Sequence, residues 1–265
     1  MMFHGEDISL QSRESHQRTI DMSNVSTLDW VKIFFRSLYI QAAWNYERMQ
    51  ALGFAASMVP IIEKVSRTKD ERASFLVRHL EFFNAHPYFV NFALGASIRL
   101  EEVKEVNMEN QIRTIKNELC GPLGSLGDQL FWNGLRPMAG LIGAIIALHG
   151  SWWGSIFFLF LLNVPHLGIR YWGLKRGYDL GPDVARELVR PIYRKAMRAT
   201  QLIGAVAIGF YIGGEAGSLS KVHINHLVLF LLFIILCWVA LKRRLSLYLV
   251  FPGVVFVGLI ATYLM

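Results

Sequence analysis

The stretch PMAGLIGAIIALHGSWWGSIFFLFLLNVPHLGI, residues 137–169, contains no Lys, Arg, Asp or Glu. A helix of about 20 apolar residues crosses the hydrocarbon core of a bilayer, so this run predicts a membrane segment. The sequence HGSWWGS at 149–155 interrupts the run and leaves a short piece on each side. Two interpretations follow: one long tilted helix, or a helical hairpin with its tip at 149–155. Gly and Ser at the interruption favour the hairpin.

Two more uncharged runs follow, at 224–241 and 245–265. The chain of 265 residues is 53% hydrophobic and 18% charged, whereas soluble domains are about 25% charged. We therefore expect an all-α polytopic membrane protein. Short apolar segments broken by Gly and Pro are typical of the broken helices and re-entrant hairpins of transporters.

Charge is distributed unevenly along the chain. Residues 1–120 hold 14 basic and 15 acidic residues, whereas 121–265 hold 13 basic and 5 acidic ones. Eight of these bases fall between Arg170 and Arg198. Because bases beside apolar spans mark the cytoplasmic side, we exclude nucleic acid as a partner and place this segment in the cytoplasm. A phosphorylated protein partner on that face stays open.

We divide the chain into a disordered N-terminal tail, residues 1–27, and a membrane domain, residues 28–265. Within the domain, 28–120 is expected to form amphipathic or half-buried helices. Residues 121–181 are expected to form a binding loop and a hairpin, and 199–265 to form C-terminal transmembrane helices. The tail lacks an apolar core and is not a signal peptide.

The first helix is expected to begin near Leu28, with Ser26 or Thr27 as its cap and Asp29 in its first turn. Apolar residues at three- and four-residue steps predict that an amphipathic helix continues through QAAWNYERMQ (41–50) toward Pro60. The two cysteines, Cys120 and Cys237, show no metal-ligand spacing, and we expect no disulfide.

Two segments, residues 41–50 and 121–137, combine aromatic rings with amides, carboxylates and a guanidinium. Sugar hydroxyls take hydrogen bonds from such polar groups, and the C–H face of a sugar rests on an aromatic ring. The segment at 121–137, GPLGSLGDQLFWNGLRP, therefore predicts a binding loop at the head of a re-entrant hairpin. The candidate substrate-binding residues are Trp44, Asn45, Glu47, Asp128 and Trp132, with Gln41, Arg48 and Arg136 in support.

A purely structural alternative exists for the charged members of both segments. Glu47 could pair with Arg136, and Arg48 with Asp128, which would only neutralise charge near the membrane. No phosphate-binding loop, GxSxG or HExxH motif occurs in the sequence. We therefore predict no catalytic residue, no metal and no cofactor.

Four stretches carry a resemblance to a known family: QAAWNYERMQALGFAASMVP, RHLEFFNAHPYFVNFALGASIRLEE, GPLGSLGDQLFWNGLRP and RYWGLKRGYDLG. Together they resemble the membrane IID component of the mannose/fructose/sorbose family of the bacterial sugar phosphotransferase system. The similarity runs continuously from about residue 28 to residue 181. The chain departs from the family pattern at Gly124-Ser125 and at Asn133-Gly134, which bears on the identity of the sugar.

The resemblance implies a partner set and a location. A IID chain pairs with a IIC membrane subunit in the bacterial inner membrane, and together they carry a hexose or related sugar across it. The sugar is phosphorylated on entry by IIB, which IIA charges. IID is part of this phosphotransferase complex but has no phosphoryl-carrying residue of its own. An elevator-type transporter, assembled from IIC–IID pairs within membrane lipid, is implied. The alternative function is a membrane scaffold or receptor that recruits cytoplasmic proteins without transport.

These inferences give each site residue a role. Asn45, Glu47 and Asp128 would bind sugar hydroxyls, and Trp44 or Trp132 would stack on the ring. The two arginines would hold the carboxylates in place. The bases also predict a topology in which residues 199–214 leave the cytoplasm, 224–241 return, and the last span leaves Met265 outside.

Overall fold

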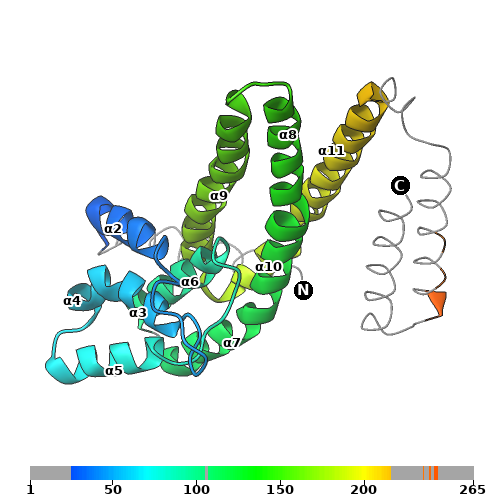
Figure 1. Ribbon diagram of the computed structural model, residues 1–265. Coiled ribbons are helices and arrows are strands. Elements are labelled where there is room, and N and C mark those ends of the chain that lie inside the picture. Colours follow the sequence, from blue (N-terminus) through cyan, green and yellow to red (C-terminus); the bar gives the residue numbers. More distant parts are fainter. Residues whose placement is uncertain (1–24, 105–106, 216–234, 236–238, 240–241, 244–265) are drawn as a thin grey trace, which may run out of the picture. The chain divides into compact units, whose positions relative to one another are not determined.

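The computed structural model describes residues 25–104 and 107–215, together with residues 235, 239, 242 and 243. Regular secondary structure in this part is helical (Figure 1). The chain forms two compact units, Met1–Ala207 and Ile208–Met265, and the features below belong to the first. Residues 1–24 of the predicted tail and the predicted span at 245–265 lie outside the described residues, as does the span at 224–241 except for residues 235 and 239.

The described elements are, in chain order, α2 (Thr27–Ser37), α3 (Ala51–Met58), η1 (Val59–Ile61), α4 (Ile62–Val65), α5 (Lys69–His79), α6 (Val90–Val103), α7 (Met108–Gly127), η2 (Asp128–Leu135), α8 (Arg136–Leu148), α9 (Trp153–Leu180), η3 (Gly181–Val184), α10 (Ala185–Leu188) and α11 (Pro191–Glu215). η1 and η3 are 3-10 turns, and η2 is a π-helix.

Helix α2 begins as the sequence predicts. Ser26 is the N-cap, and its hydroxyl accepts a hydrogen bond from the backbone of Asp29, whose carboxylate accepts one in return from the Ser26 backbone. This capping box satisfies two amides that the first turn leaves without partners. The side chain of Asp29 also pairs with Lys64, which fixes the start of α2 against α4.

The predicted continuation of this helix through 41–50 is wrong. Helix α2 ends at Ser37, and turns and an irregular segment lead to α3. Asn45 and Met49 exchange two backbone hydrogen bonds, and the amide of Gln50 donates to the carbonyl of Phe83 at 2.9 Å. The bond from the Gln50 amide to Phe83 replaces a helical one, and Met49 has a φ of 55°, which a right-handed α-helix does not allow.

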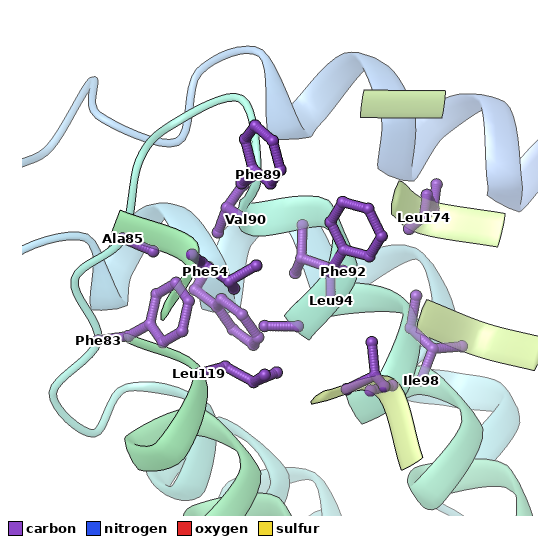
Figure 2. Close-up of a cluster of buried hydrophobic side chains, with 14 of the residues drawn as sticks. Phe54, Phe83, Ala85, Phe89, Val90, Phe92, Leu94, Ile98, Leu119 and Leu174 are labelled. Atoms are coloured by element: carbon purple, nitrogen blue, oxygen red, sulfur yellow. The ribbon is translucent and has the colours of Figure 1, made fainter. Parts of the chain in front are cut away.

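Helix α6 lies at the centre of the buried core. Fully buried aromatic rings from the segment before α6 and from α3 meet it, as do aliphatic residues of α7 and α9 (Figure 2). Rings this large bury much of their area and dominate the packing energy of such a core. Members of this core include Phe54, Phe83, Phe89, Phe92, Leu94, Ile98, Leu119 and Leu174.

Helices α6 and α9 approach each other through glycines. A Cβ added at Gly95 would lie 2.2 Å from the carbonyl oxygen of Leu174, and one at Gly177 would lie 2.1 Å from that of Phe92. Any side chain at either position would therefore force the two backbones apart. Small residues on facing turns are the usual means of close helix packing in membranes.

Helices α8 and α9 form the predicted hairpin, and they stand side by side in Figure 1. The chain turns at His149–Trp152, where Gly150 has a φ of +79°. Next to the turn, a Cβ at Gly154 would lie 2.3 Å from the carbonyl oxygen of Gly143. The alternative of one long tilted helix is therefore wrong.

The predicted loop at 121–137 is helical instead. Helix α7 passes through Pro122, continues as the π-helix η2 and enters α8 without a break. Two of the glycines serve close packing here: a Cβ at Gly127 would lie 2.2 Å from the His86 side chain, and one at Gly134 would lie 2.5 Å from the hydroxyl of Thr200. These two glycines therefore occur where neighbouring elements press against a helix, whereas Gly121 and Gly124 would have nothing within 4 Å of an added Cβ.

A buried ionic network joins α5, α6 and α7. Arg78 donates to both carboxylate oxygens of Glu101, at 2.5 and 2.9 Å, and to Glu109 at 3.1 Å. His79 meets the same Glu101 at 2.9 Å, and because a carboxylate only accepts, Nε2 carries the proton. Lys116 donates to the carbonyls of residues 78, 79 and 81 and so caps the end of α5.

One helical run in the described part is long and apolar enough to cross a membrane, judged by length and composition. It extends over 41 residues, Met108–Leu148, and so comprises α7, η2 and α8.

Candidate functional site

The first candidate segment, residues 41–48, is an exposed loop with a fixed backbone. Asn45 Oδ1 accepts a hydrogen bond from the amide of Arg48 at 2.8 Å, which closes a tight turn, and Asn45 itself is exposed. The rings of Trp44 and Tyr46 meet edge to face at 4.8 Å. Tyr46 is 86% exposed, and the side chain of Glu47 is 79% exposed.

The second candidate segment is η2 together with the first residue of α8. Its outward positions carry Asp128, Trp132 and Arg136, all exposed, while Phe131 and Leu135 point into the core. The guanidinium of Arg136 lies over the Trp132 ring, 5.0 Å from its centroid. A π-helix of this kind is often found at functional sites, because its wider turn changes the direction of side chains.

Both candidate segments rest on one stretch of chain, residues 83–88. The Gln50 side chain donates to the carbonyl of Ala85 at 2.7 Å and accepts from its amide at 3.2 Å, which holds the end of the loop. On the other side, the His86 ring stacks on Phe131 at 5.6 Å and lies 5.0 Å from Trp132. The fold therefore gives the two segments a common base.

The structural alternative predicted two ion pairs, Glu47 with Arg136 and Arg48 with Asp128, and neither is among the ion pairs of the described residues. Instead Arg48 Nε donates to its neighbour Glu47 at 3.3 Å. This exposed pair stabilises the fold by at most about 1 kcal/mol. The charges of the site are thus in solvent, where a ligand or a partner subunit can reach them, and Gln41 is exposed as well.

The sequence interpretation missed a partly buried polar cluster beside η2. The rings of Tyr88 and His166 stack at 3.8 Å, and Arg170 Nε donates to His166 Nε2 at 2.8 Å. Arg170, expected on the cytoplasmic surface, is 2% exposed and donates to the carbonyl of Ser37 at 2.6 Å. His166 and Arg170 are four residues apart on one helix face, but nothing local marks Tyr88 as their neighbour.

The basic segment at residues 170–198 contains a buried carboxylate that pairs with two arginines. Glu187 is buried and accepts from Arg176 at 2.9 Å and from Arg190 at 2.7 Å. Burial raises the pKa of this carboxyl group, but hydrogen bonds from Arg190 and Arg176 outweigh burial and leave the pKa below its ordinary value. Arg194 and Arg198 are exposed, and no ion pair of the described residues includes them.

No group of three or more His, Cys, Asp or Glu side chains is placed to hold a metal ion in the part of the chain that the structure describes. The polar groups available at the two candidate segments are therefore carboxylates, amides and guanidinium groups next to indole rings. This set suits a neutral polyhydroxylated ligand.

A family model described as the PTS system mannose/fructose/sorbose family IID component matches residues 24–214, well over half of the chain. The chain belongs to this IID family. The matched range includes all eight predicted site residues, from Gln41 to Arg136.

Curated relatives of this IID chain carry names with different sugars. It is 38% identical over 181 residues to the mannose-specific EIID component of Escherichia coli K12, an alignment that covers 67% of this chain and 64% of that protein. It is 34% identical to the fructose permease IID component of Bacillus subtilis, with 67% and 66% covered. The sorbose-specific EIID component of Lacticaseibacillus casei is 32% identical, with 69% and 66% covered. The chain thus spans about two thirds or less of the length of these relatives.

Two solved structures resemble the IID chain over most of its length. One is a chain in the cryo-EM structure of the mannose transporter ManYZ with microcin E492, at 29% identity and a TM-score of 0.58. The other is described as a membrane protein, at 29% identity and a TM-score of 0.70. Each alignment covers 91% of this chain and 97% of the other. The helical fold is therefore that of a membrane component.

Proposed function

We propose that this IID chain is the membrane subunit of a sugar phosphotransferase permease. With a IIC subunit it would form the pathway for a hexose or related sugar, which IIB phosphorylates on entry. The match of residues 24–214 to the IID family carries the proposal. Transport is then driven by trapping, because the phosphorylated sugar is charged and cannot return. The scaffold alternative receives no comparable support.

The exposed surface of α9 supports a membrane-spanning hairpin. Trp152 and Trp153 are exposed at its tip, and Tyr171 and Trp172 are exposed near its other end. From Trp153 to Tyr171 the helix rises about 27 Å, close to the thickness of the hydrocarbon core. Trp and Tyr are typical of both membrane interfaces.

Between these aromatic pairs α9 presents a surface suited to lipid. Exposed Phe, Leu, Ile and Val side chains cover it, and the amino group of Asn163 donates to the carbonyl of Leu159 at 2.8 Å within the same helix. The hairpin would thus enter from the cytoplasmic side of a bacterial inner membrane as part of a multi-pass subunit. The close-packed hairpin of α8 and α9 would suit an elevator-type transporter that is built as an oligomer of IIC–IID pairs.

The sugar site would lie where the two candidate segments face IIC. Asn45, Glu47 and Asp128 would bind sugar hydroxyls, and Trp44 or Trp132 would support the ring. Arg48 would orient Glu47, and Arg136 would hold the Trp132 ring in place. The exposure of these groups in the single chain supports the proposal, because a half-built site must leave its ligands open until the partner covers them.

The proposed role of Asp128 is tested by Asp128→Asn in the purified IIC–IID complex. Asn keeps the shape and one acceptor oxygen but removes the charge, and an exposed Asp128 needs no ion pair for folding. We expect normal assembly with IIC and a loss of sugar affinity of about 1.5–3 kcal/mol, the usual value of a hydrogen bond to a charged group. Calorimetric titration with the transported sugar measures this.

The matched control is Asp70→Asn, which removes an exposed carboxylate from α5, outside both segments. It should leave both assembly and affinity unchanged. If Asp128→Asn instead lowers the yield of the complex while the surviving complex binds sugar normally, Asp128 is structural and its ligand role is wrong.

A further inference from the structure

A groove between α2 and the cytoplasmic end of α9 takes no part in the proposed sugar site. Its volume is about 550 Å³, and its walls include Trp30, Val31 and Phe35 of α2 and Tyr171 and Tyr178 of α9. The rings of Trp30 and Tyr178, which both line the groove, meet edge to face at 4.9 Å. The other end lies toward Ser37, which Arg170 contacts.

The groove is open to the surroundings, yet the residues that line it are largely apolar. Val31 is 45% exposed and Phe35 is 58% exposed. Apolar surface gathered in a concave patch marks a binding surface rather than a scatter of solvent-facing residues. Its occupant must therefore bring a long apolar part.

Polarity changes along the groove in one direction. Thr27, Lys175 and the hydroxyl of Tyr178 lie toward the end that is farther from the hairpin tip, whereas Phe35 and Tyr171 lie toward the membrane. No lining residue is acidic, and the hydroxyl of Tyr178 donates to Glu102 at 2.5 Å. Lys175 is exposed and enters none of the ion pairs of the described residues, so its charge is available to an anionic group.

The depth of the groove matches the headgroup region. It begins at Tyr171, in the aromatic pair that marks the cytoplasmic interface in the proposed placement, and extends over about two helical turns beyond it. A phosphate at Lys175 with an acyl chain directed past Phe35 toward the hydrocarbon core would follow the polarity of the groove. Bases at this level attract anionic lipids of the cytoplasmic leaflet.

We propose that the groove binds one anionic phospholipid of the cytoplasmic leaflet. Its phosphate lies at Thr27 and Lys175, and one acyl chain lies along Val31, Phe35 and Tyr171. The bound lipid fills the space between α2 and α9 and so fixes the helix that leads into the 41–48 loop. The proposal rests on the membrane placement in the proposed function, but it does not depend on the sugar.

The test uses the IIC–IID complex in nanodiscs of phosphatidylcholine that contain a trace of lipid with a photoreactive acyl chain. The trace lipid is phosphatidylglycerol in one sample and phosphatidylcholine in the other, and labelled peptides are mapped by mass spectrometry. We expect phosphatidylglycerol to label the Val31–Phe35 stretch and Tyr171 more strongly than phosphatidylcholine does. Lys175→Gln should reduce that labelling about fivefold, the effect of one Lys at the membrane surface.

Two further variants make the result specific. Val31→Trp fills the groove and should abolish labelling of α2, whereas Lys195→Gln removes an exposed base elsewhere and should change nothing. Equal labelling by both lipids, or labelling that Val31→Trp leaves intact, would overturn the lipid site. A photoreactive residue at position 31 that crosslinks to IIC would overturn it as well, because a protein would then cover the groove.

The same experiment separates this proposal from the proposed function. Lipid-facing residues of α9 such as Phe160 should be labelled by both lipids in every variant. If Phe160 is unlabelled, the membrane placement itself is wrong. If Phe160 is labelled and the groove is not, the lipid site alone is wrong.

Discussion

At the scale of single residues, carboxylates separate into two groups by their surroundings. Glu101 is 1% exposed and is held by Arg78 and His79, whereas Glu47 is 79% exposed beside Arg48. A buried carboxylate must keep its cationic partners, because an unpaired buried charge is costly. An exposed carboxylate is free to exchange its water for a ligand. The first kind maintains the fold, and the second is available for function.

Glu101→Gln should destabilise the chain strongly. The substitution leaves Arg78 buried without its carboxylate, and breaking a buried pair in this way costs about 3–5 kcal/mol. We expect a clear fall in the unfolding temperature of the purified complex, measured by differential scanning fluorimetry, and lower accumulation in membranes. Glu109→Gln is the control, because Glu109 meets the same arginine with a side chain that is 57% exposed. That variant should cost about 1 kcal/mol or less, and equal effects of the two substitutions would contradict the network.

Residue chemistry was easier to predict than residue contacts. The cap at Ser26 and the exposed aromatic and carboxylate groups of the candidate site follow from local sequence. The position of Arg170 does not, because its partner Ser37 is 133 residues away. A basic residue next to an apolar run predicts a surface charge, and only the packing of α2 on α9 shows that Arg170 is buried.

At the scale of elements, close packing explains the glycines at which two backbones or a backbone and a side chain meet. The α8–α9 hairpin could be predicted, because its turn is marked by Gly and Ser between apolar runs. The helical course of 121–135 could not, because glycines that mark a loop locally serve here as contacts with His86 and Thr200. For residues 41–50 the error is the reverse, because a helix was predicted and the segment is irregular. Its apolar residues do have helical periodicity, but hydrogen bonds to Phe83 outweigh that preference.

Gly177→Ala should weaken the α6–α9 contact. The new Cβ would lie 2.1 Å from the carbonyl oxygen of Phe92, which is backbone and cannot rotate away. Overpacking of this kind costs about 1–3 kcal/mol, so we expect a lower unfolding temperature and reduced co-purification with IIC. Gly168→Ala lies on the same helix with nothing within 4 Å of its Cβ and should be neutral or slightly stabilising. A neutral Gly177→Ala would mean that the two helices are not packed as described.

At the scale of the whole molecule, the first unit combines a polar, ion-paired base of short helices with an apolar hairpin. The bases from Lys175 to Arg198 mark one side, and the exposed Trp152 and Trp153 mark the other. Composition alone indicates a membrane protein. Which surfaces would meet lipid and which would meet the proposed IIC partner depends on the burial pattern that the packed helices create.

Cysteine labelling in intact cells tests this topology. In a background without Cys120 and Cys237, Ser151→Cys at the hairpin tip should react with a membrane-impermeant maleimide from outside. Arg194→Cys in the basic segment should react only after the cells are opened. Labelling of position 194 in intact cells would show that the chain has the opposite orientation in the membrane.

The most direct measurement is sugar uptake into vesicles that contain IIC and IID and enclose IIA, IIB and their phosphoryl donor. Radiolabelled mannose, fructose and sorbose are offered in parallel, and each protein is omitted in turn. We predict accumulation of the phosphorylated form of at least one sugar with the full set, and none when either IID or IIC is left out. Undiminished uptake without IID, or uptake by IID alone, would contradict a pathway shared by the two subunits.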